Sequence, residues 1–472
     1  MNHQLISENI STLTCSHLII GSGPGGLITA KKLIEAGHDV ILVEEGNFTN
    51  SATSQKYKNY DKMNRMWRNG GITSAFGEIS LLYAEGSAVG GGAEINSGIM
   101  QRAKTEVIEE WVKNNQLKNF SAAILNQYYD EIFDLVSPPE ALTNPSSDIL
   151  IAAANKLNWK AEMLKIAYEP NGDKISLNKI ILNDLLAKGL RLFSNLKAEK
   201  INYKQGKAFE IECRSKNNST HKIKFDYLFL AAGAIQSPFL LLKSGLKKSV
   251  GRSLQFHPTL KVAALFDHAI NENPAKVPGS AITEFMPDIR IGGSVFTRGF
   301  FAMFLSEDWQ ERSWMFDKYK NCGIYYAMIR PQGKARILKI PFLPDPIILA
   351  KFTNRDKEIL REALDKLSQA MFAAGAKFVY PSIYGHKGFS QYEKIEITNY
   401  KNLNLMSIHA FSSLPSGEIE SCPVDSFGKL KMLENIYICD ASIIPSAPGT
   451  NPQATIMAMV ARNLDIFNQK ND

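Results

Sequence analysis

The sequence predicts an α/β fold with two domains, one of which is assembled from segments that are far apart in the chain. Three observations support this prediction. A glycine-rich turn joins an apolar strand to a helix at residues 18–37, and a similar strand, glycine turn and helix recur at 229–238. A third apolar strand ends at Asp440, shortly before a final helix. By contrast, short runs of aromatic and β-branched residues over 261–326 are typical of a mostly antiparallel sheet.

The first of these motifs carries the most information. Gly21 permits a tight turn, Gly23 lets the backbone approach a pyrophosphate, and Gly26 lets the helix and the strand pack closely. The helix N-terminus directs unpaired N–H groups and the positive end of the helix dipole at a diphosphate. Gly37 ends the helix, and an apolar run then leads to Glu44, about 20 residues after the turn, which can accept hydrogen bonds from ribose hydroxyls. The pattern predicts a Rossmann-like domain that binds a dinucleotide, with a purely structural βαβ unit as the alternative.

The composition is that of a globular protein. At 472 residues the chain is too long for one ordinary core, so two or three domains are expected. Hydrophobic residues make up 44% and charged residues 21%, and no run of about 20 apolar residues predicts a membrane span. The start of the chain lacks the basic segment and apolar core of a secretory signal. Because the five cysteines are scattered and form no CxxC pair, we expect a cytoplasmic protein with neither a disulfide framework nor a metal site.

The charge of the chain excludes one class of partner and leaves another open. The formal net charge is +7, but the lysines are spread along the sequence. Dispersed lysines are typical of a solvated surface, whereas nucleic-acid-binding proteins concentrate basic residues in one tract. We therefore expect no nucleic-acid partner. Peripheral contact with an anionic membrane surface, or an acidic substrate, stays open.

A second glycine-rich stretch lies at 86–98. Four glycines within seven positions, Gly86 and Gly90 to Gly92, disfavour both helix and strand and predict backbone contact with a bound group. A flexible surface loop is the alternative, although the flanking residues are apolar. The polar stretch 47–62 has no clear period and predicts a loop or a lid.

Helices and strands alternate through the middle of the chain. The helical spacing of apolar residues over 104–136 predicts a long helical block. A short helix is expected at 182–190, and an amphipathic helix at 355–375. The strands expected between these helices lie near 192 and at 198–203, 207–213 and 222–230.

The last fifty residues contain the third strand, loop and helix. After Asp440, a loop rich in proline and glycine leads to a helix with Asn451 as its expected N-cap and Pro452 in its first turn. Asn-Pro is a good helix start and needs no ligand. Alternatively, this helix directs its positive end at a bound flavin ring and stabilises negative charge there.

Five motifs, in this order, resemble those of the glucose–methanol–choline (GMC) oxidoreductases. They are the glycine turn at 21–26, the stretch 86–96, and the segments 231–238, 251–258 and 440–455. Because they run from one end of the chain to the other, the match is more specific than any single motif. Within the family, the Val89-Gly-Gly-Gly pattern and the helix end at 373–376 are most similar to the cholesterol oxidase and long-chain alcohol oxidase branch.

The resemblance implies a bound FAD. The residues expected on its ADP half and adenine are Gly21, Gly23, Gly26, Glu44 and Ala198. The residues expected along its pyrophosphate, ribityl chain and ring are Gly90, Gly91, Gly92, Asn96, Asp440, Ala441 and Gln453, and the glycine turn at Gly233 is expected beside the dinucleotide. Members with a tethered flavin carry a histidine directly before the motif asparagine. Because Ile95 stands there in this chain, non-covalent FAD is predicted.

The resemblance also implies a catalytic pair, His409 and Asn451. His409 would take the proton of a substrate hydroxyl as general base, since an ordinary histidine pKa near 6.5 is close to working pH. Asn451 would hold the oxygen while the substrate carbon passes a hydride to flavin N5. His257 matches a family position that is usually outside this pair, and a structural role is favoured for it.

The expected reaction is FAD-dependent oxidation of a small-molecule alcohol to the carbonyl, with oxygen or another electron acceptor reoxidising the flavin. The branch acts on sterols and long-chain alcohols, so an apolar or amphipathic substrate is expected. A cluster of large apolar side chains in the predicted substrate domain agrees with this expectation, although the same residues could simply form the core of a sheet. The cluster comprises Phe285, Phe296, Phe300, Phe301, Met303 and Phe304.

Two other functions stay open at this stage. The first is a GMC-type lyase, like a hydroxynitrile lyase or a fatty-acid photodecarboxylase; the latter needs a cysteine and an arginine, such as Cys322 with Arg298 or Arg330. The second is a catalytically inactive flavoprotein, because Ser412-Ser413 stands where family members usually have a glycine pair or Gly-Thr.

The predicted domains alternate along the chain. The FAD-binding domain is expected to comprise 1–103, 175–262 and 425–472. The substrate-binding domain, a mostly antiparallel sheet flanked by helices, is expected to comprise 104–174 and 263–424.

Overall fold

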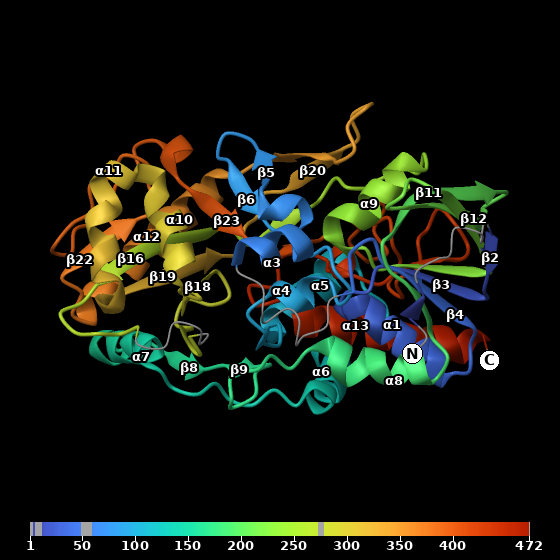
Figure 1. Ribbon diagram of the computed structural model, residues 1–472, viewed down its shortest axis with the longest axis horizontal. Coiled ribbons are helices and arrows are strands. Elements are labelled where there is room, and N and C mark those ends of the chain that lie inside the picture. The colour runs from blue at the N-terminus through green and yellow to red at the C-terminus, as the bar shows by residue number, and fades with distance from the viewer. Residues whose placement is uncertain (1–2, 5–11, 49–58, 272–277, 472) are drawn as a thin grey trace.

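The computed structural model describes residues 3–4, 12–48, 59–271 and 278–471. Figure 1 shows an elongated molecule, with a parallel sheet and both ends of the chain in one half and a larger sheet in the other. The chain crosses between the halves several times. Among the described helices, none is long and apolar enough to cross a membrane.

Six parallel strands form the sheet of the first half, in the order β1-β10-β4-β3-β14-β25. Their bounds are β1 His3–Gln4, β3 His17–Ile20, β4 Val40–Val43, β10 Arg191–Phe193, β14 Tyr227–Leu230 and β25 Ile436–Ile438. Every residue of β3 and β4 is buried, as expected for a parallel sheet that is covered on both faces. Because these strands come from widely separated stretches of the chain, the structure confirms a Rossmann-like domain built from discontinuous segments.

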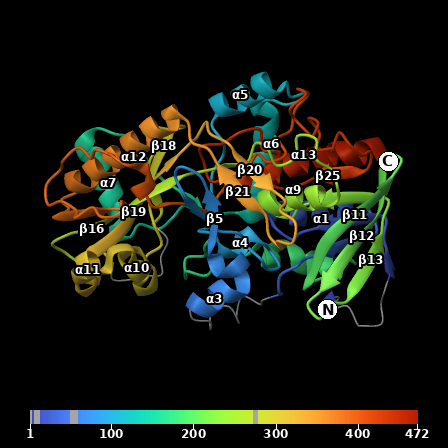
Figure 2. The ribbon, with the colours of Figure 1, turned by 90° about the horizontal axis from the view of Figure 1, so that it is seen from above.

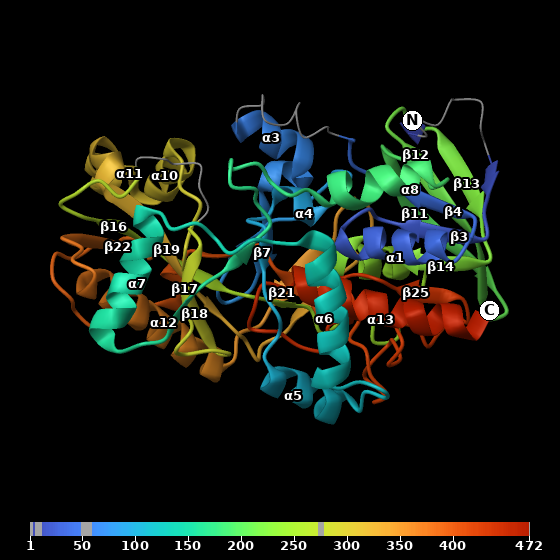
Figure 3. The same ribbon diagram turned by 90° about the horizontal axis from the view of Figure 1, so that it is seen from below.

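Helices cover this sheet in a row (Figure 3). Helix α1 (Pro24–Glu35) packs on β3 and β4, α13 (Gln453–Asn471) packs beside α1, and α6 (Ala122–Val136) packs beside α13. The first glycine turn therefore lies directly between β3 and α1, as predicted. Short helical segments at Asn178–Leu182 and Asn183–Ala187 (α8) precede β10.

A second, four-stranded sheet lies at the edge of this half (Figure 2). Its strands are β2 Thr12–Thr14, β11 Leu196–Lys204, β12 Lys207–Ser215 and β13 Thr220–Lys224, in the order β11-β12-β13-β2. Helix α9 (Gly233–Lys243) packs against β11. The predicted passage of strands over 198–230 is confirmed.

The other half is organised around an eleven-stranded sheet that is mostly antiparallel. Its strands are β5 Thr73–Phe76, β6 Leu81–Tyr83, β8 Ala161–Met163, β16 Thr259–Leu265, β17 Ser280–Ile282, β18 Ile289–Gly293, β19 Cys322–Ile329, β20 Ala335–Leu338, β21 Ile347–Ala350, β22 Phe378–Pro381 and β23 Leu405–Ser407. The pairs β21–β5 and β23–β6 are parallel. A sheet-rich domain was predicted here.

Two segments lie on the opposite side of the predicted domain boundaries. Strands β5 and β6 pair in the large sheet, although residues 1–103 were expected in the FAD-binding domain. Conversely, α6 packs against α13, although 104–174 was expected in the substrate-binding domain. Both differences arise because each continuous range was expected to lie in one domain, whereas the chain passes from one half of the molecule to the other within each of these ranges.

The predicted helical block over 104–136 is two helices. Helix α5 (Thr105–Asn115) ends at Gln116, which has a left-handed backbone (φ +53°), and α6 begins after Ser121, whose side chain accepts a hydrogen bond from Ile124 N–H. The predicted helix at 355–375 is α12 (Asn354–Ala373), which begins with a capping box. Helix α7 (Pro145–Leu157) packs against α12.

The prediction of sheet throughout 261–326 was wrong for its middle part. Residues 298–321 form α10 (Arg298–Leu305), α11 (Trp309–Arg312) and turns of 3-10 helix. Thr297 caps α10 by accepting a hydrogen bond from Phe300 N–H, and the buried residues of α10 fall at helical spacing: Phe301, Phe304 and Leu305.

Several short helices and strands complete the fold. They are α3 Asn59–Met66, α4 Gly92–Ile95, β7 Ile99–Met100, β9 Lys165–Ile166, β15 Gln255–Phe256 and β24 Ala410–Phe411. Most of the predicted loop or lid at 47–62 lies outside the described residues; its last residues belong to α3.

Candidate active site

One cavity runs between the two halves, from the glycine turn after β3 to the loop that precedes α13. Thirteen of the predicted site residues line it: Gly21, Gly23, Glu44, Gly91, Gly92, Asn96, Ala198, Gly233, His409, Asp440, Ala441, Asn451 and Gln453. The fold therefore brings together residues from seven separate stretches of the sequence.

Gly26 and Gly90 are not among the lining residues, and each has a packing role. A Cβ on Gly26 would lie 2.0 Å from Gly21 O, so Gly26 allows the close helix–strand contact that was predicted for it. Gly90 was expected along the cofactor. Instead, its N–H donates to Ser22 Oγ (3.0 Å), and a Cβ there would lie 2.5 Å from Glu94 Cγ. Gly90 thus joins the second glycine stretch to the first.

The nucleotide end of the cavity is built mainly from backbone. Glu44 is buried, and its carboxylate accepts hydrogen bonds from Ser22 N–H (3.0 Å), Ser22 Oγ (2.7 Å) and Gly46 N–H (2.8 Å). Burial raises the pKa of Glu44, and these hydrogen bonds oppose the increase. The carboxylate is fixed at the end of β4, where a ribose is expected.

The space around the glycine turn fits a dinucleotide. A Cβ built on Gly23 meets nothing within 4 Å, and the same holds for Gly92 and Gly233. These glycines therefore keep open a cradle at the N-termini of α1 and α9, where unpaired N–H groups favour a diphosphate. The residues present fit the adenosine diphosphate half of FAD.

Asp440 connects the third strand unit to the second. Its carboxylate accepts hydrogen bonds from Gly233 N–H (2.9 Å) and Ser442 N–H (2.9 Å), and from the hydroxyls of Ser237 and Ser442. Burial raises the pKa of Asp440, which the hydrogen bonds oppose. The carboxylate thus sets the position of the α9 N-terminus relative to the end of β25.

Asn96 and Gln453 meet across the cavity, with Asn96 Nδ2 donating to Gln453 Oε1 (2.6 Å). Asn96 Oδ1 accepts from Gly98 N–H (2.9 Å) and from Lys174 Nζ (2.9 Å). Lys174 is a contact that the sequence did not indicate. Burial lowers its pKa to about 8, and the nearby carboxylate of Glu94 opposes this decrease.

The two predicted catalytic residues are in contact at the other end of the cavity. His409 Nε2 lies 3.2 Å from Asn451 Nδ2. On the opposite side of the ring, His409 Nδ1 lies 3.0 Å from His257 Nδ1. His257 is fully buried and does not line the cavity, and Gly449 N–H donates to its Nε2 (3.2 Å).

Arg290, from β18, completes this row behind Asn451. Its Nη1 donates to Asn451 Oδ1 (2.8 Å) and to the Tyr326 hydroxyl (3.1 Å). The side chain is 1% exposed, its Nε and Nη2 have no hydrogen-bond partner, and no ion pair involving it occurs among the described residues. Because a guanidinium only donates, Asn451 must direct its Oδ1 at Arg290 and its Nδ2 at His409.

This arrangement restricts where the protons of the two histidines lie. Both ends of the pair face an N–H donor, from Gly449 at one end and Asn451 at the other. If His257 Nε2 and His409 Nε2 both accepted these N–H groups, each neutral ring would carry its one proton on Nδ1. The two Nδ1 atoms face each other, and only one proton fits between them. The second proton therefore belongs to an outer nitrogen, at His257 Nε2 or at His409 Nε2, and the latter opens on the cavity.

The electrostatics keep both rings neutral. Burial, with the positive charge of Arg290 as the second cause, lowers the pKa of His409 to about 3. Burial also lowers the pKa of His257 well below its ordinary value; a proton on His409 would lower it further, and so does the charge of Arg290. The two imidazole rings thus resist protonation, and the pKa of His409 lies well below the 6.5 expected from the sequence.

Asn451 was predicted to cap the last helix, but it does not. Helix α13 begins at Gln453, and its first turn is closed by Ile456 N–H donating to Pro452 O (2.9 Å). The Asn451 side chain instead bonds Arg290 and His409, which lie on distant strands and loops.

The predicted aromatic cluster does not line the cavity. Phe296, Phe301 and Phe304 belong to a separate buried cluster, packed against Met315 and Tyr319. Phe285 stacks edge-on against Trp159, and Met303 is 55% exposed. These side chains give no indication of the substrate.

The alternative residue set for a fatty-acid photodecarboxylase is not assembled either. Cys322 is buried in the same separate cluster. Arg330 is ion-paired with Glu110, and Arg298 lies over the ring of Tyr319. None of the three belongs to the lining residues that the structure describes.

The Ser412-Ser413 departure does not displace His409 from the cavity wall. Ser412 has a left-handed backbone (φ +65°), which is the conformation that glycine favours, and its Oγ is buried without a partner. Ser412 N–H donates to Ala441 O (3.1 Å), so the loop runs along the end of β25 and holds His409 over the cavity.

Comparisons with known proteins agree on one family. Models of the GMC oxidoreductase family match residues 63–259 and 343–460, and a model of an FAD-binding domain matches 16–55. An uncharacterised GMC-type oxidoreductase of Sinorhizobium fredii is 38% identical over 95% of this chain and 94% of its own. The long-chain-alcohol oxidase FAO4B of Arabidopsis thaliana is 25% identical over 96% of this chain and 67% of its own.

A solved structure shares the fold at much lower identity. The crystal structure of pyridoxine 4-oxidase from Mesorbium loti superposes with a TM-score of 0.74 at 16% identity, covering 96% of this chain and 99% of that one. At that identity the similarity concerns the fold.

Proposed function

Because this chain belongs to the GMC oxidoreductase family and is an FAD-dependent oxidoreductase, we propose that it oxidises an alcohol CH–OH group to the carbonyl, with His409 and Asn451 as its catalytic residues. One observation carries the proposal: His409 Nε2 and the Asn451 amide are 3.2 Å apart on the wall of a cavity that extends to the glycine turn. Two polar groups are thus available to a single alcohol oxygen.

In this proposal His409 receives the hydroxyl proton at Nε2. The tautomer that does so carries its own proton on Nδ1, and this N–H donates a hydrogen bond to His257 Nδ1. His257 thereby shares the positive charge that forms, in a row where burial disfavours a charge on either ring. His257 is in this view more than the structural residue expected from the sequence.

Asn451 orients the substrate oxygen with an amide whose direction is fixed by Arg290. The bound FAD supplies the two-electron acceptor for the oxidation. Ile95 ends α4 beside Asn96, at the position where a histidine tethers the flavin in some relatives, so we propose non-covalent binding.

We propose an apolar or amphipathic substrate. Four apolar lining residues support this: Ile99, Ile408, Ala410 and Ile456. The long-chain-alcohol oxidases among the relatives point in the same direction. The proposed partners are therefore a small-molecule alcohol and oxygen or another electron acceptor.

Anaerobic flavin reduction tests the proposal. Sterols, fatty alcohols, sugars, choline and pyridoxine are mixed with the holoenzyme, and flavin bleaching is followed by stopped flow. We expect an alcohol to bleach the flavin, and His409→Ala to slow bleaching by about 10²–10⁴-fold at unchanged FAD content. Admission of air then distinguishes oxygen from another acceptor.

The exposed His268 provides a matched control, because His268→Ala removes an imidazole that is not among the described cavity-lining residues. It is expected to leave the bleaching rate unchanged. A flavin that no alcohol reduces would favour the inactive flavoprotein, and His409→Ala with the wild-type rate would exclude His409 as the base.

A further inference from the structure

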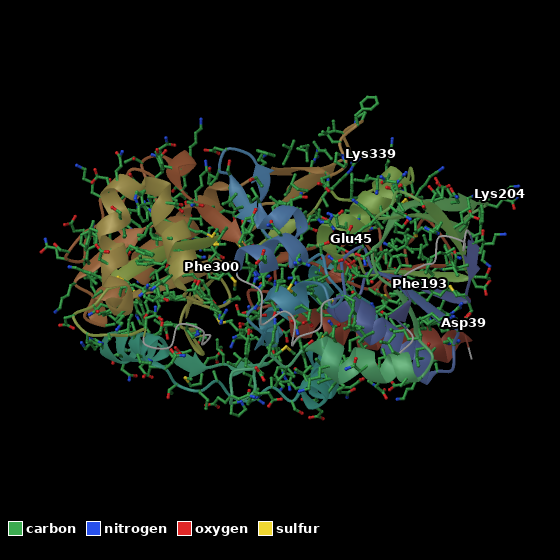
Figure 4. All side chains as sticks on the ribbon, in the orientation of Figure 1. Asp39, Glu45, Phe193, Lys204, Phe300 and Lys339 are labelled. Carbon is green, nitrogen blue, oxygen red and sulfur yellow. The ribbon has the colours of Figure 1, made fainter. Side chains whose placement is uncertain are left out.

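The hairpin of β20 and β21 ends in a projecting loop in which every residue from Lys339 to Pro344 is exposed. Residues 339–346, hereafter the finger, rise from the top edge of the large sheet in Figure 1, and Figure 4 shows Lys339 at the base of this projection. Three apolar side chains of the finger are exposed: Ile340 by 39%, Leu343 by 47% and Phe342 completely. Pro341, Pro344 and Pro346 stiffen the loop.

Folding gives no reason for a phenylalanine at the tip. Phe342 has a left-handed backbone (φ +69°), a conformation that is unfavourable for bulky residues. Its ring is fully exposed to solvent, so no packing within the chain compensates. A strained, exposed aromatic residue between two other exposed apolar residues is typical of a contact surface.

The apolar surface continues from the finger towards the cavity. Leu349 of β21 pairs in register with Phe76 of β5, and both are exposed, by 44% and 50%. Leu82 of β6 lies on the same face, because it pairs with Ser74, two residues before Phe76, and is 44% exposed. Ile408, which lines the cavity and is 50% exposed, follows β23, the neighbour of β6.

The residues around the finger are predominantly basic. Lys334, Arg336, Lys339 and Lys351 are exposed, while the acid between them, Asp345, is hydrogen-bonded to Asn69. The segment 247–252 lies alongside, since Ile337 N–H donates to Gly251 O (2.8 Å). That segment contributes three further exposed cations, Lys247, Lys248 and Arg252, of which Lys248 is ion-paired with the exposed Glu420.

We propose that the finger inserts its apolar tip into an anionic membrane surface, with the surrounding lysines and arginines bound to the lipid headgroups. Apolar side chains at the tip and cations behind it are the arrangement that interfacial binding requires. Charge favours lipid over a second copy of this chain, because the same basic rim and a net charge of +7 would face each other in a dimer. This inference is independent of which alcohol is oxidised.

Vesicle co-sedimentation tests the docking surface. The holoenzyme is incubated with vesicles of phosphatidylcholine alone or with one third phosphatidylglycerol. We expect sedimentation with the anionic vesicles, weakened by salt, and a loss of on the order of tenfold or more in the combined variant Ile340→Ser, Phe342→Ser and Leu343→Ser. Lys339→Glu is expected to lower binding about fivefold.

Phe209→Ser is the matched control, because Phe209 is 47% exposed on β12, in the other half of the molecule. It should bind vesicles like the wild type, and FAD content and melting temperature should be unchanged in all variants. Wild-type protein that stays in the supernatant, or a triple variant that sediments equally well, overturns the proposal. So does size-exclusion chromatography showing a dimer that the triple variant dissociates, since the occupant is then a second copy.

Discussion

The two ends of the cavity are built from different materials. At the nucleotide end, glycines and backbone amides leave an open cradle, and the carboxylates of Glu44 and Asp440 are bound by the chain itself. At the other end, four side chains from distant segments form one hydrogen-bonded row, from His257 to Arg290. The nucleotide end depends on the absence of side chains at its glycines, whereas the other end depends on hydrogen bonds between side chains. The two ends should therefore respond differently to substitution.

The largest expected effect lies at the nucleotide end. A Cβ on Gly25 would lie 1.9 Å from Cys439 O, a backbone atom that cannot move without shifting β25 against α1. We expect Gly25→Ala to give no soluble, folded protein, because overpacking against backbone has no low-energy relief. Yield and circular dichroism measure this.

Gly23→Ala is the matched comparison two residues away. Nothing lies within 4 Å of its Cβ, so the variant should fold with a melting temperature near that of the wild-type apoprotein. The methyl group projects into the cradle, and FAD affinity should fall by about 10-fold or more, as measured by fluorescence titration. Equal FAD affinity would show that the cofactor does not approach this glycine.

The next effect concerns the row of side chains. Arg290→Met removes the donor that orients the Asn451 amide and the positive charge that lowers the pKa of His409. We expect flavin reduction to slow by about tenfold or more. Because the pKa of His409 is about 3 with the arginine present, the wild-type rate should be flat from pH 8 down to about 4, whereas Arg290→Met should gain an acid limb within this range as the pKa rises.

Arg290→Lys separates the two contributions. Lysine keeps the charge, so its pH profile should stay flat, but it lacks the planar fork that fixes the amide, so its rate should fall. A flat profile for Arg290→Met would show that the charge does not act on His409.

The same buried rings should make the protein sensitive to acid. His257 and His409 have pKa values below the ordinary 6.5, so below that pH the unfolded chain binds protons that the folded chain does not. Stability is therefore full above about pH 6.5 and falls as the pH decreases, by about 2 kcal/mol per ring at pH 5. Urea unfolding at pH 7.5 and pH 5 measures this.

His409→Asn should reduce this loss by about 2 kcal/mol, the share of its own ring, whereas the exposed His268→Asn should leave it unchanged. An equal loss in His409→Asn and wild type would place the acid sensitivity elsewhere, for example at His17, where burial lowers the pKa to about 4.

The comparison also explains what the sequence could predict. Gly21, Gly23 and Glu44 lie within one short stretch, and their roles follow from a local strand, turn and helix, so the sequence was sufficient to place them. Gly25, inside the same motif, was missed because its constraint comes from Cys439, far along the chain.

Arg290 could not be predicted for the same reason. It lies in β18 among ordinary strand residues, and its contact with Asn451 exists only because two distant segments fold together. Asn451 itself was assigned as a cap because Asn-Pro is a local helix signal, but tertiary hydrogen bonds determine its side chain. The helices at 298–321 were missed because an aromatic-rich run is typical of a strand. Only the spacing of three and four residues between its buried apolar side chains indicates a helix.

The smallest effect tests whether the loop between the two ends is under strain. Ser412 has a left-handed backbone and a buried hydroxyl without a partner, so Ser412→Gly should relieve both and stabilise the protein by about 1 kcal/mol, net of the entropy that glycine adds to the unfolded chain. Ser412→Ala keeps the strained backbone and removes only the hydroxyl, so the difference between the two variants isolates the backbone contribution. Urea unfolding measures both. The rate of flavin reduction should not change, because His409 is held by His257 and Asn451 rather than by the Ser412 side chain. If Ser412→Gly were instead less stable than the wild type, the serine would be shown to stabilise the loop.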